Sequence, residues 1–225
     1  MIKTYFGPMG SGKTKTLVEL YNNIYFKDKV QVFAPKMDDR FGVGVIQDRN
    51  DTDGSRKIYA TPIDDIFQIE GFLQPTTKKV FIDEINFLES EENPEKGIDL
   101  RILEKRRYES MRLILKLAQE RKIAFYLFGL NLTAEMKPYG LMPIAMAYAD
   151  DRIELFAECA DCGEVARFSY YIPYEKGTNA VGAEDYCALC AKCHFEWESR
   201  FKQYKAANQI EEYLNLAKAL KPNKQ

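Results

Sequence analysis

Near its start the chain reads Gly7-Pro8-Met9-Gly10-Ser11-Gly12-Lys13-Thr14, which follows the pattern G-x-x-x-x-G-K-T. The flanking residues fit this pattern. Residues 2–6 are rich in the β-branched and aromatic side chains that strands favour, and residues 16–25 carry apolar side chains at helical spacing. A strand, a glycine-rich loop and a helix in this order predict backbone N–H groups curled around an anion at the start of the helix.

The residue types in this loop specify the anion more closely. Lys13 is placed to reach the β- and γ-phosphates of a nucleoside triphosphate, and the hydroxyl group of Thr14 to ligate Mg²⁺. The alternative is an ordinary glycine turn beside a surface lysine, which would require neither the strand before it nor the helix after it. We therefore expect the whole loop, Gly7 to Thr14, to bind a nucleoside triphosphate.

A second motif, Val80-Phe81-Ile82-Asp83-Glu84, is an apolar run that ends in two carboxylates. A continuous apolar run is typical of a central strand in a parallel sheet, which is buried on both faces. Because ligands of such sheets bind beyond the carboxyl ends of the strands, Asp83 and Glu84 are expected near the phosphates. Asp83 can then hold Mg²⁺, directly or through water, which leaves Glu84 to act on a nucleophile. An apolar strand that ends in Asp-Glu is common, so its functional interpretation depends on its presence together with the phosphate loop at residues 7–14.

Length and composition limit the possible classes of protein. A chain of 225 residues suits one large domain, or one medium domain with a small addition. Its 46% hydrophobic and 13% aromatic residues support a packed core rather than disorder. The 32 basic and 34 acidic side chains nearly balance, which gives no support to a protein that coats nucleic acid. We find neither a signal peptide nor a membrane span, so we expect a cytoplasmic protein.

The cysteines form two C-x-x-C pairs, Cys159 with Cys162 and Cys190 with Cys193, separated by 27 residues, and Cys187 is left over. Two such pairs can supply four thiolates around Zn²⁺, and four protein ligands make the metal structural. Residues 190–194 also match the C-x-x-C-H motif of c-type haem attachment, but that interpretation needs an export compartment and leaves the first pair unexplained. An iron–sulfur centre and simple buried thiols are further alternatives, whereas disulfides do not suit a reducing cytosol.

The order of predicted elements indicates an α/β protein with a small addition. Strands are predicted at 29–34 and 122–130, a helix at 98–121 and an exposed loop at 89–97, and such alternation implies a parallel sheet wrapped by helices. From about residue 153 short β segments surround the cysteines, and an amphipathic helix is predicted near 209–220. The expected domains are a phosphate-loop α/β domain at 1–152, a zinc-ribbon domain at 153–195 and a helical tail at 196–225.

Shorter motifs lie between these features: Pro35 with Asp38-Asp39-Arg40, Asp53-Gly54, Phe87, Gly129-Leu130, Pro138-Tyr139-Gly140, Met142-Pro143 and Gly182-Ala183-Glu184-Asp185-Tyr186. In their order and spacing around the phosphate loop and the cysteine pairs, these motifs resemble the thymidine kinase family. Within this family, they resemble the small, zinc-containing kinases of the bacterial, viral and cytosolic type. The resemblance covers roughly residues 1–195.

This resemblance implies a kinase that transfers the γ-phosphoryl group of ATP to the 5′-hydroxyl group of thymidine or a related pyrimidine deoxynucleoside. It implies that Glu84 takes the proton from that hydroxyl group. Charge on the phosphates would be neutralised by Lys13, Thr14 with Mg²⁺, and Arg40. Asp38 and Asp83 would arrange the metal or its waters, and Asp39 belongs to the same matched segment as Asp38 and Arg40.

The resemblance also implies a lid over the nucleoside. The segment between the cysteine pairs, Gly163 to Leu189, would form a lasso-like flap that excludes water and is anchored by the zinc ribbon. The residues implied to bind the nucleoside are Met9, Phe87, Leu130, Ala134, Tyr139, Thr178, Asn179, Ala180, Val181 and Tyr186. A dimer or tetramer is implied as well.

The sequence departs from the family pattern mainly on the nucleoside side. Asn86 replaces a usual Gln, Asn131 an Asp, Ala134 an aromatic residue, Thr52 a His and Val181 a Gly. Replacing an aromatic residue by Ala removes packing worth about 1–3 kcal/mol for a stacked base. We therefore expect intact phosphate handling, while the preferred pyrimidine deoxynucleoside stays open.

Two other classes of function are compatible with parts of the sequence. One is an ATPase that acts on nucleic acid through its zinc ribbon, against which the nearly balanced charge argues. The other is a catalytically faded family member that binds nucleotides for regulation. The presence of Lys13, Thr14, Asp83 and Glu84 argues against this second class.

Overall fold

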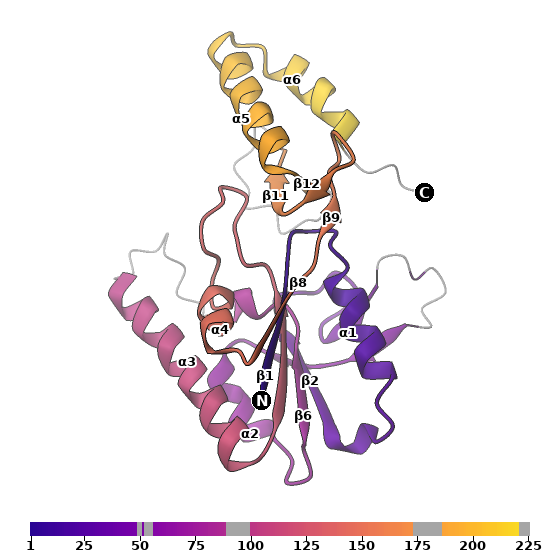
Figure 1. Ribbon diagram of the computed structural model, residues 1–225, viewed down its shortest axis with the longest axis vertical. Helices are drawn as coiled ribbons and strands as arrows, with labels where there is room; N and C mark the ends of the chain where they lie inside the picture. The colour runs from indigo at the N-terminus through magenta and orange to yellow at the C-terminus, as the bar shows by residue number, and fades with distance from the viewer. Residues whose placement is uncertain (49–50, 52–55, 89–99, 173–185, 221–225) are drawn as a thin grey trace. The chain divides into compact units, whose positions relative to one another are not determined.

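The computed structural model describes residues 1–48, 51, 56–88, 100–172 and 186–220 (Figure 1). The chain divides into two compact units. The first comprises Met1–Phe6, Lys13–Asn131 and Pro138–Glu154, and the second comprises Gly7–Gly12, Leu132–Lys137 and Leu155–Gln225. The exposed loop expected at 89–97 lies outside the described residues.

A six-stranded sheet in the order β5-β2-β6-β7-β1-β8 forms the centre of the first unit. Its strand pairs are all parallel. The strands are β1 (Ile2–Phe6), β2 (Val30–Pro35), β5 (Thr61–Ile63), β6 (Lys79–Ile82), β7 (Ala124–Gly129) and β8 (Asp151–Glu154). The inner strands β6 and β7 are apolar along most of their length because both faces of a parallel sheet are covered. The expected α/β class is therefore confirmed.

Helices cover the two faces of this sheet. In Figure 1, α1 (Lys13–Asn22) lies on one side, and α3 (Leu100–Glu120) and α4 (Met142–Tyr148) lie on the other. Met111 and Ile114 on the predicted inner face of α3 pack in a buried core with Phe33, Ile82 and Phe125 of the sheet. Short helical segments complete the connections, namely η1 (Lys27–Lys29), η2 (Ile66–Gln68), α2 (Ile69–Phe72) and η3 (Ile85–Phe87). A small antiparallel hairpin of β3 (Val45–Gln47) and β4 (Lys57–Tyr59) was not expected.

The second unit has its own core. It contains two antiparallel strand pairs, β9 (Ala157–Glu158) with β10 (Val165–Ala166) and β11 (Phe168–Tyr171) with β12 (Tyr186–Leu189). The helices α5 (Ala191–Ala206) and α6 (Ile210–Ala217) follow, and η6 (Lys218–Leu220) ends the described chain. Tyr213 of α6 is fully buried at the centre of this core. Its hydroxyl group lies 2.7 Å from that of Tyr170, and its ring contacts those of Trp197, Phe201 and Tyr204.

Several element boundaries differ from those expected. Strand β7 begins at Ala124 rather than 122 because Lys122 has a φ of 57°, which ends the preceding helical turn. Helix α5 was predicted only in part, since the helical tail expected at 196–225 covers its later residues but not its start at Ala191. It was difficult to recognise because the buried residues of the helix are only Cys193, His194 and Trp197, a short apolar face. The boundary expected between 195 and 196 falls inside this helix.

Membrane insertion through a helix finds no support in the described part of the chain. None of the helices there is both long enough and apolar enough to span a bilayer.

Candidate active site

The phosphate loop joins β1 to α1, as the sequence predicts. Gly10 and Gly12 have φ values of 77° and 79°, in the region that favours glycine, so side chains at these positions would strain the loop. Lys13 is the first residue of α1 and is only 8% exposed. The loop also has a contact that the sequence did not predict. The backbone N–H of Met9 donates a hydrogen bond to Oγ of Ser169 on β11 (3.0 Å).

Three carboxylates surround Arg40 in the first unit. Asp38 follows β2, and Asp83 and Glu84 follow β6, the parallel neighbour of β2, so the carboxyl ends of two adjacent strands bring them together. Arg40 binds Asp38 with two hydrogen bonds, Nε to Oδ1 and Nη2 to Oδ2, each 2.6 Å long. Its Nη2 also lies 3.5 Å from Oε1 of Glu84. The hydrogen bonds with Asp38 raise the pKa of Arg40, so this guanidinium carries a permanent positive charge.

Asp39 was expected in the same group, but its side chain is exposed. Its carbonyl oxygen accepts a hydrogen bond from the N–H of Gly42 (2.9 Å), which places it in the turn after Asp38. The structure thus brings Asp38, Arg40, Asp83 and Glu84 together and gives Asp39 a turn contact.

Glu84 has an unusual backbone and an unusual side chain. Its φ and ψ are both 44°, a left-handed conformation that is uncommon for a residue other than glycine and is often found where function requires it. Its side chain is 13% exposed. Within the described residues, its Oε2 is buried without a hydrogen-bond partner. A buried carboxylate oxygen without a partner is costly in free energy, which points to a ligand that satisfies it.

Asp83 is the most deeply buried member of the group, at 4% exposure. Burial raises the pKa of its carboxyl group to about 7, the negative charges of Glu84 and Asp38 act in the same direction, and Arg40 opposes them. The N–H of Glu84 donates to its Oδ1 (3.1 Å). A cation bound at this carboxyl group would favour the ionised form.

The residues implied to bind a nucleoside are divided between the two units. In the first, the rings of Phe87 and Tyr139 meet edge to face with centroids 5.5 Å apart. Leu130 is held through its N–H by Oδ1 of the buried Asn86 (2.9 Å), a role for Asn86 that the sequence did not reveal. In the second, Tyr186 contacts the ring of Tyr171.

Also in the second unit, the carbonyl oxygen of Ala134 lies 2.9 Å from Nε2 of His194. Thr178, Asn179, Ala180 and Val181 lie outside the described residues, as does the middle of the expected lid, residues 173–185.

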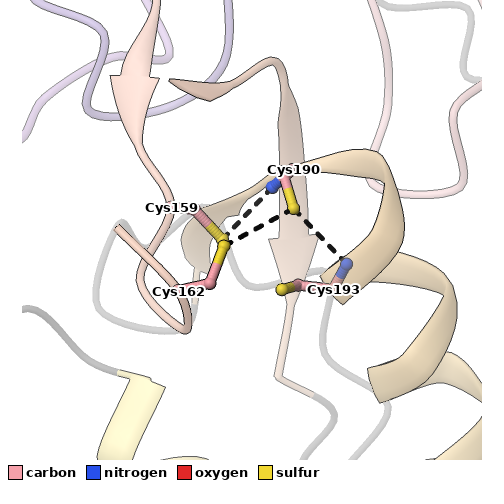
Figure 2. A group of neighbouring side chains, drawn as sticks. All are labelled: Cys159, Cys162, Cys190 and Cys193. Atoms are coloured by element: carbon pink, nitrogen blue, oxygen red, sulfur yellow. Dashed lines mark hydrogen bonds between the residues drawn. The ribbon is translucent and has the colours of Figure 1, made fainter. Parts of the chain in front are cut away.

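The four paired cysteines converge in the second unit (Figure 2). The Sγ atoms of Cys159, Cys162, Cys190 and Cys193 all lie within 4.8 Å of one another. A tetrahedron of sulfurs about 2.3 Å from a central Zn²⁺ has edges of about 3.8 Å. The distance between Sγ of Cys162 and Sγ of Cys190 is 3.8 Å. The cluster therefore fits a zinc ion in both its donors and its size.

Backbone groups in this cluster favour thiolates. The N–H of Cys190 donates to Sγ of Cys159 (3.3 Å), and that of Cys193 donates to Sγ of Cys190 (3.5 Å). Although burial opposes ionisation, such N–H donors lower the pKa of Cys159 to about 7. Cys187 lies outside the cluster, and burial raises its pKa to about 12, as expected for a bystander. Covalent haem attachment would need Cys190 and Cys193, which are already committed to the four-sulfur group.

A phosphate loop before α1, a parallel sheet, and acidic residues at the ends of β2 and β6 are typical of the P-loop class of nucleotide-binding proteins. Comparison with known proteins narrows this class. The family model for thymidine kinase matches residues 1–194. The chain belongs to the thymidine kinase family.

Individual relatives agree with the family match. A thymidine kinase of Mycoplasma mobile is 27% identical over 202 residues, which cover 89% of this chain and 90% of the relative. One from Bacteroides fragilis is 27% identical over 195 residues, covering 86% of each chain. One from Bdellovibrio bacteriovorus is 29% identical over 202 residues, covering 88% of this chain and 86% of the relative.

Proposed function

We propose that this protein transfers the γ-phosphoryl group of ATP to the 5′-hydroxyl group of thymidine, giving thymidine 5′-monophosphate and ADP. Membership of the thymidine kinase family supports this reaction. The observation that carries it is the carboxylate of Glu84, with one buried oxygen lacking a partner in the described chain and the other facing Arg40. A general base must offer such an oxygen to the hydroxyl group that it deprotonates.

In this proposal Glu84 accepts the proton of the 5′-hydroxyl group. At the same time, the oxygen of that hydroxyl group forms a bond to the γ-phosphorus. The bond between that phosphorus and the bridging oxygen to the β-phosphate breaks, and ADP leaves with the electron pair. Lys13 and Arg40 place positive charge beside the transferred group. Both oxygens of Asp38 accept hydrogen bonds from Arg40, so we propose that Asp38 mainly orients this guanidinium.

Thr14 and Asp83 are the residues that would hold Mg²⁺, directly or through water. The cation would supply positive charge for the oxygens of the β- and γ-phosphates. The buried carboxyl group of Asp83, whose pKa is raised by burial, fits this assignment, since it becomes a favourable ligand once a cation compensates its charge. We propose a structural Zn²⁺ at Cys159, Cys162, Cys190 and Cys193.

The nucleoside contacts in this proposal follow from the family resemblance. Ala134 stands where the family usually has an aromatic residue, so deoxyuridine or a modified pyrimidine deoxynucleoside is the second candidate substrate. A homodimer or homotetramer and a cytoplasmic location also stay predictions. An ATPase that acts on nucleic acid gains no support from the formal charge of −2.

The reaction is tested by following ADP release with ATP, Mg²⁺ and a panel of nucleosides. We expect turnover of thymidine or another pyrimidine deoxynucleoside, and a loss of kcat of about 100-fold or more in Glu84→Gln, because the substitution keeps the size of the side chain and removes the base.

A matched control is Glu109→Gln, an exposed glutamate on α3 paired with Lys105, which should leave kcat unchanged. Absence of turnover with every nucleoside would exclude the kinase, and an unchanged kcat in Glu84→Gln would exclude this base.

A further inference from the structure

His194, the only histidine of the chain, directly follows the metal-cluster residue Cys193 in α5. It is fully buried, and its ring packs edge to face against Phe168 and Tyr170 of β11. Its Nδ1 lies 3.8 Å from Oε1 of Glu198, beyond hydrogen-bond distance. Among the described residues, the remaining polar contact of the ring is therefore the one made by Nε2.

That contact is with the carbonyl oxygen of Ala134, at 2.9 Å. A carbonyl oxygen can only accept, so Nε2 carries the proton and donates. A hydrogen bond from a buried ring to a backbone group of a loop helps to fix the position of the loop, because breaking it leaves the buried donor unpaired.

The loop in question, Leu132–Lys137, belongs to the second unit although the chain on either side belongs to the first. It is tightly folded, since the N–H of Thr133 donates to the carbonyl of Lys137 (2.8 Å) and Met136 has a φ of 58°. Because the loop is closed by its own hydrogen bonds, we expect the bond from His194 to its Ala134 carbonyl to influence where the whole loop lies.

The same ring also supports the strand that contacts the phosphate loop. Phe168 and Tyr170, on which His194 packs, flank Ser169 in β11. Ser169 is buried and accepts the hydrogen bond from the N–H of Met9. His194 thus links the metal-bearing helix with two segments, one carrying Ala134 and the other contacting Met9.

We propose that His194 is a positioning residue for nucleoside binding: through its Nε2–H bond to Ala134, the helix that carries Cys190 and Cys193 sets the position of the loop against the nucleoside. This inference depends on the proposed function, in which Ala134 contacts the nucleoside. It gives the metal cluster a role in substrate affinity in addition to stabilising the fold.

The test compares His194→Phe, which keeps an aromatic ring and removes the donor, with His194→Gln, whose Nε2 can replace the donor. The control is Trp197→Phe, a substitution at another buried residue of α5. The ring of Trp197 contacts that of Tyr213. Zinc content, kcat, and KM for thymidine and for ATP are measured for each purified protein, together with hydrogen exchange of the peptide covering 131–139.

We expect His194→Phe to raise KM for thymidine by about threefold to tenfold, the range for one lost hydrogen bond. Its kcat, its KM for ATP and its zinc content should change little, and exchange in 131–139 should become faster. In His194→Gln, KM for thymidine and the exchange rate of 131–139 should both return to within about twofold of the wild-type values. Trp197→Phe should alter neither of these two quantities.

Hydrogen exchange separates this inference from the proposed function. If the wild-type protein phosphorylates thymidine but His194→Phe changes neither KM nor exchange, the inference is overturned and the proposed function stands. Faster exchange with an unchanged KM also overturns it, because the position of the loop then does not matter to the nucleoside. If no nucleoside is a substrate of the wild-type protein, the proposed function fails, and the inference about nucleoside affinity fails with it.

Discussion

Asp83 combines deep burial with a position beside two other carboxylates. Its pKa of about 7 in the folded protein exceeds the ordinary value of 3.8. Between these two pH values the folded protein binds a proton that the unfolded chain has already released. The stability contributed by this residue is therefore greatest below pH 4 and declines as the pH rises to about 7. On the proposed function, this loss of stability in the free protein is offset when a cation binds at Asp83.

A substitution at Asp83 should reveal this cost. Asp83→Asn keeps the shape and removes the charge, so its free energy of unfolding relative to wild type should increase from pH 5 to pH 8, by on the order of 2 kcal/mol. Urea denaturation in magnesium-free buffer at the two pH values measures the difference. As a control, Asp64→Asn at an exposed position should differ from wild type in free energy of unfolding by the same amount at pH 5 and pH 8. A difference for Asp83→Asn that is constant or decreases with pH contradicts the prediction.

The residues of this acidic group were predictable from sequence to different extents. Asp83 and Glu84 could be found because an apolar run of strand length leads directly into them. The pairing of Arg40 with Asp38 and Glu84 needs the adjacency of β2 and β6, which the sequence pattern does not contain. Asn86 could be noted only as a departure from a family pattern, since its hydrogen bond to Leu130 joins residues far apart in the chain.

Strand β11 and helix α6 are joined in the second unit by the hydroxyl pair of Tyr170 and Tyr213. Burial raises the pKa of both tyrosines, Tyr170 the more strongly, so both are neutral at physiological pH and one donates to the other. This pair attaches the C-terminal helix, which lies beyond the region matched by the family, to the strand that contains Ser169.

The two hydroxyl groups should be energetically coupled. Tyr213→Phe leaves the hydroxyl group of Tyr170 buried without this partner and should cost about 1–3 kcal/mol, as should Tyr170→Phe. The double variant removes both groups and should cost less than the sum of the two single variants. Chemical denaturation followed by fluorescence of Trp197, the only tryptophan, gives the three values. Additive costs would show that the pair contributes no mutual stabilisation.

The elements themselves were predictable where the hydrophobic pattern was long. The strands β1, β2, β6 and β7 and the helix α3 each bury enough apolar residues for their period to be visible. Strand β8 and the hairpin of β3 and β4 were missed because they have three or four residues each, too few for a period. The start of helix α5 was missed because its first turn contains a cysteine pair whose spacing suggested only a metal site, whereas its later part lies within the predicted helical tail.

At the scale of the whole molecule, the described residues include two separate clusters of buried apolar side chains, one around the sheet and one around Tyr213. The four-cysteine cluster belongs to the second of these. A unit with a core of this small size commonly depends on a bound metal for its stability. The sheet has its own larger core and should not need the metal to fold.

Removing one thiolate should therefore affect the two units differently. Cys162→Ser should lower bound zinc from about one ion per chain to almost none. The fluorescence of Trp197 should shift to longer wavelength as the second unit opens, while circular dichroism retains the signal of the sheet unit. Cys187→Ala should keep its zinc, because Cys187 lies outside the cluster. Full zinc content in Cys162→Ser, or its loss in Cys187→Ala, would contradict the ligand assignment.

The left-handed backbone at Glu84 has a consequence for how this lineage can change over time. Glycine and asparagine adopt that conformation more readily than glutamate does, so selection for robustness alone would replace this residue. On the proposed function, the need for the carboxylate of a general base keeps a glutamate there. A descendant that abandoned catalysis and survived as a nucleotide sensor should drift toward glycine or asparagine at this single site, and such drift would mark the loss of chemistry before the phosphate loop decays.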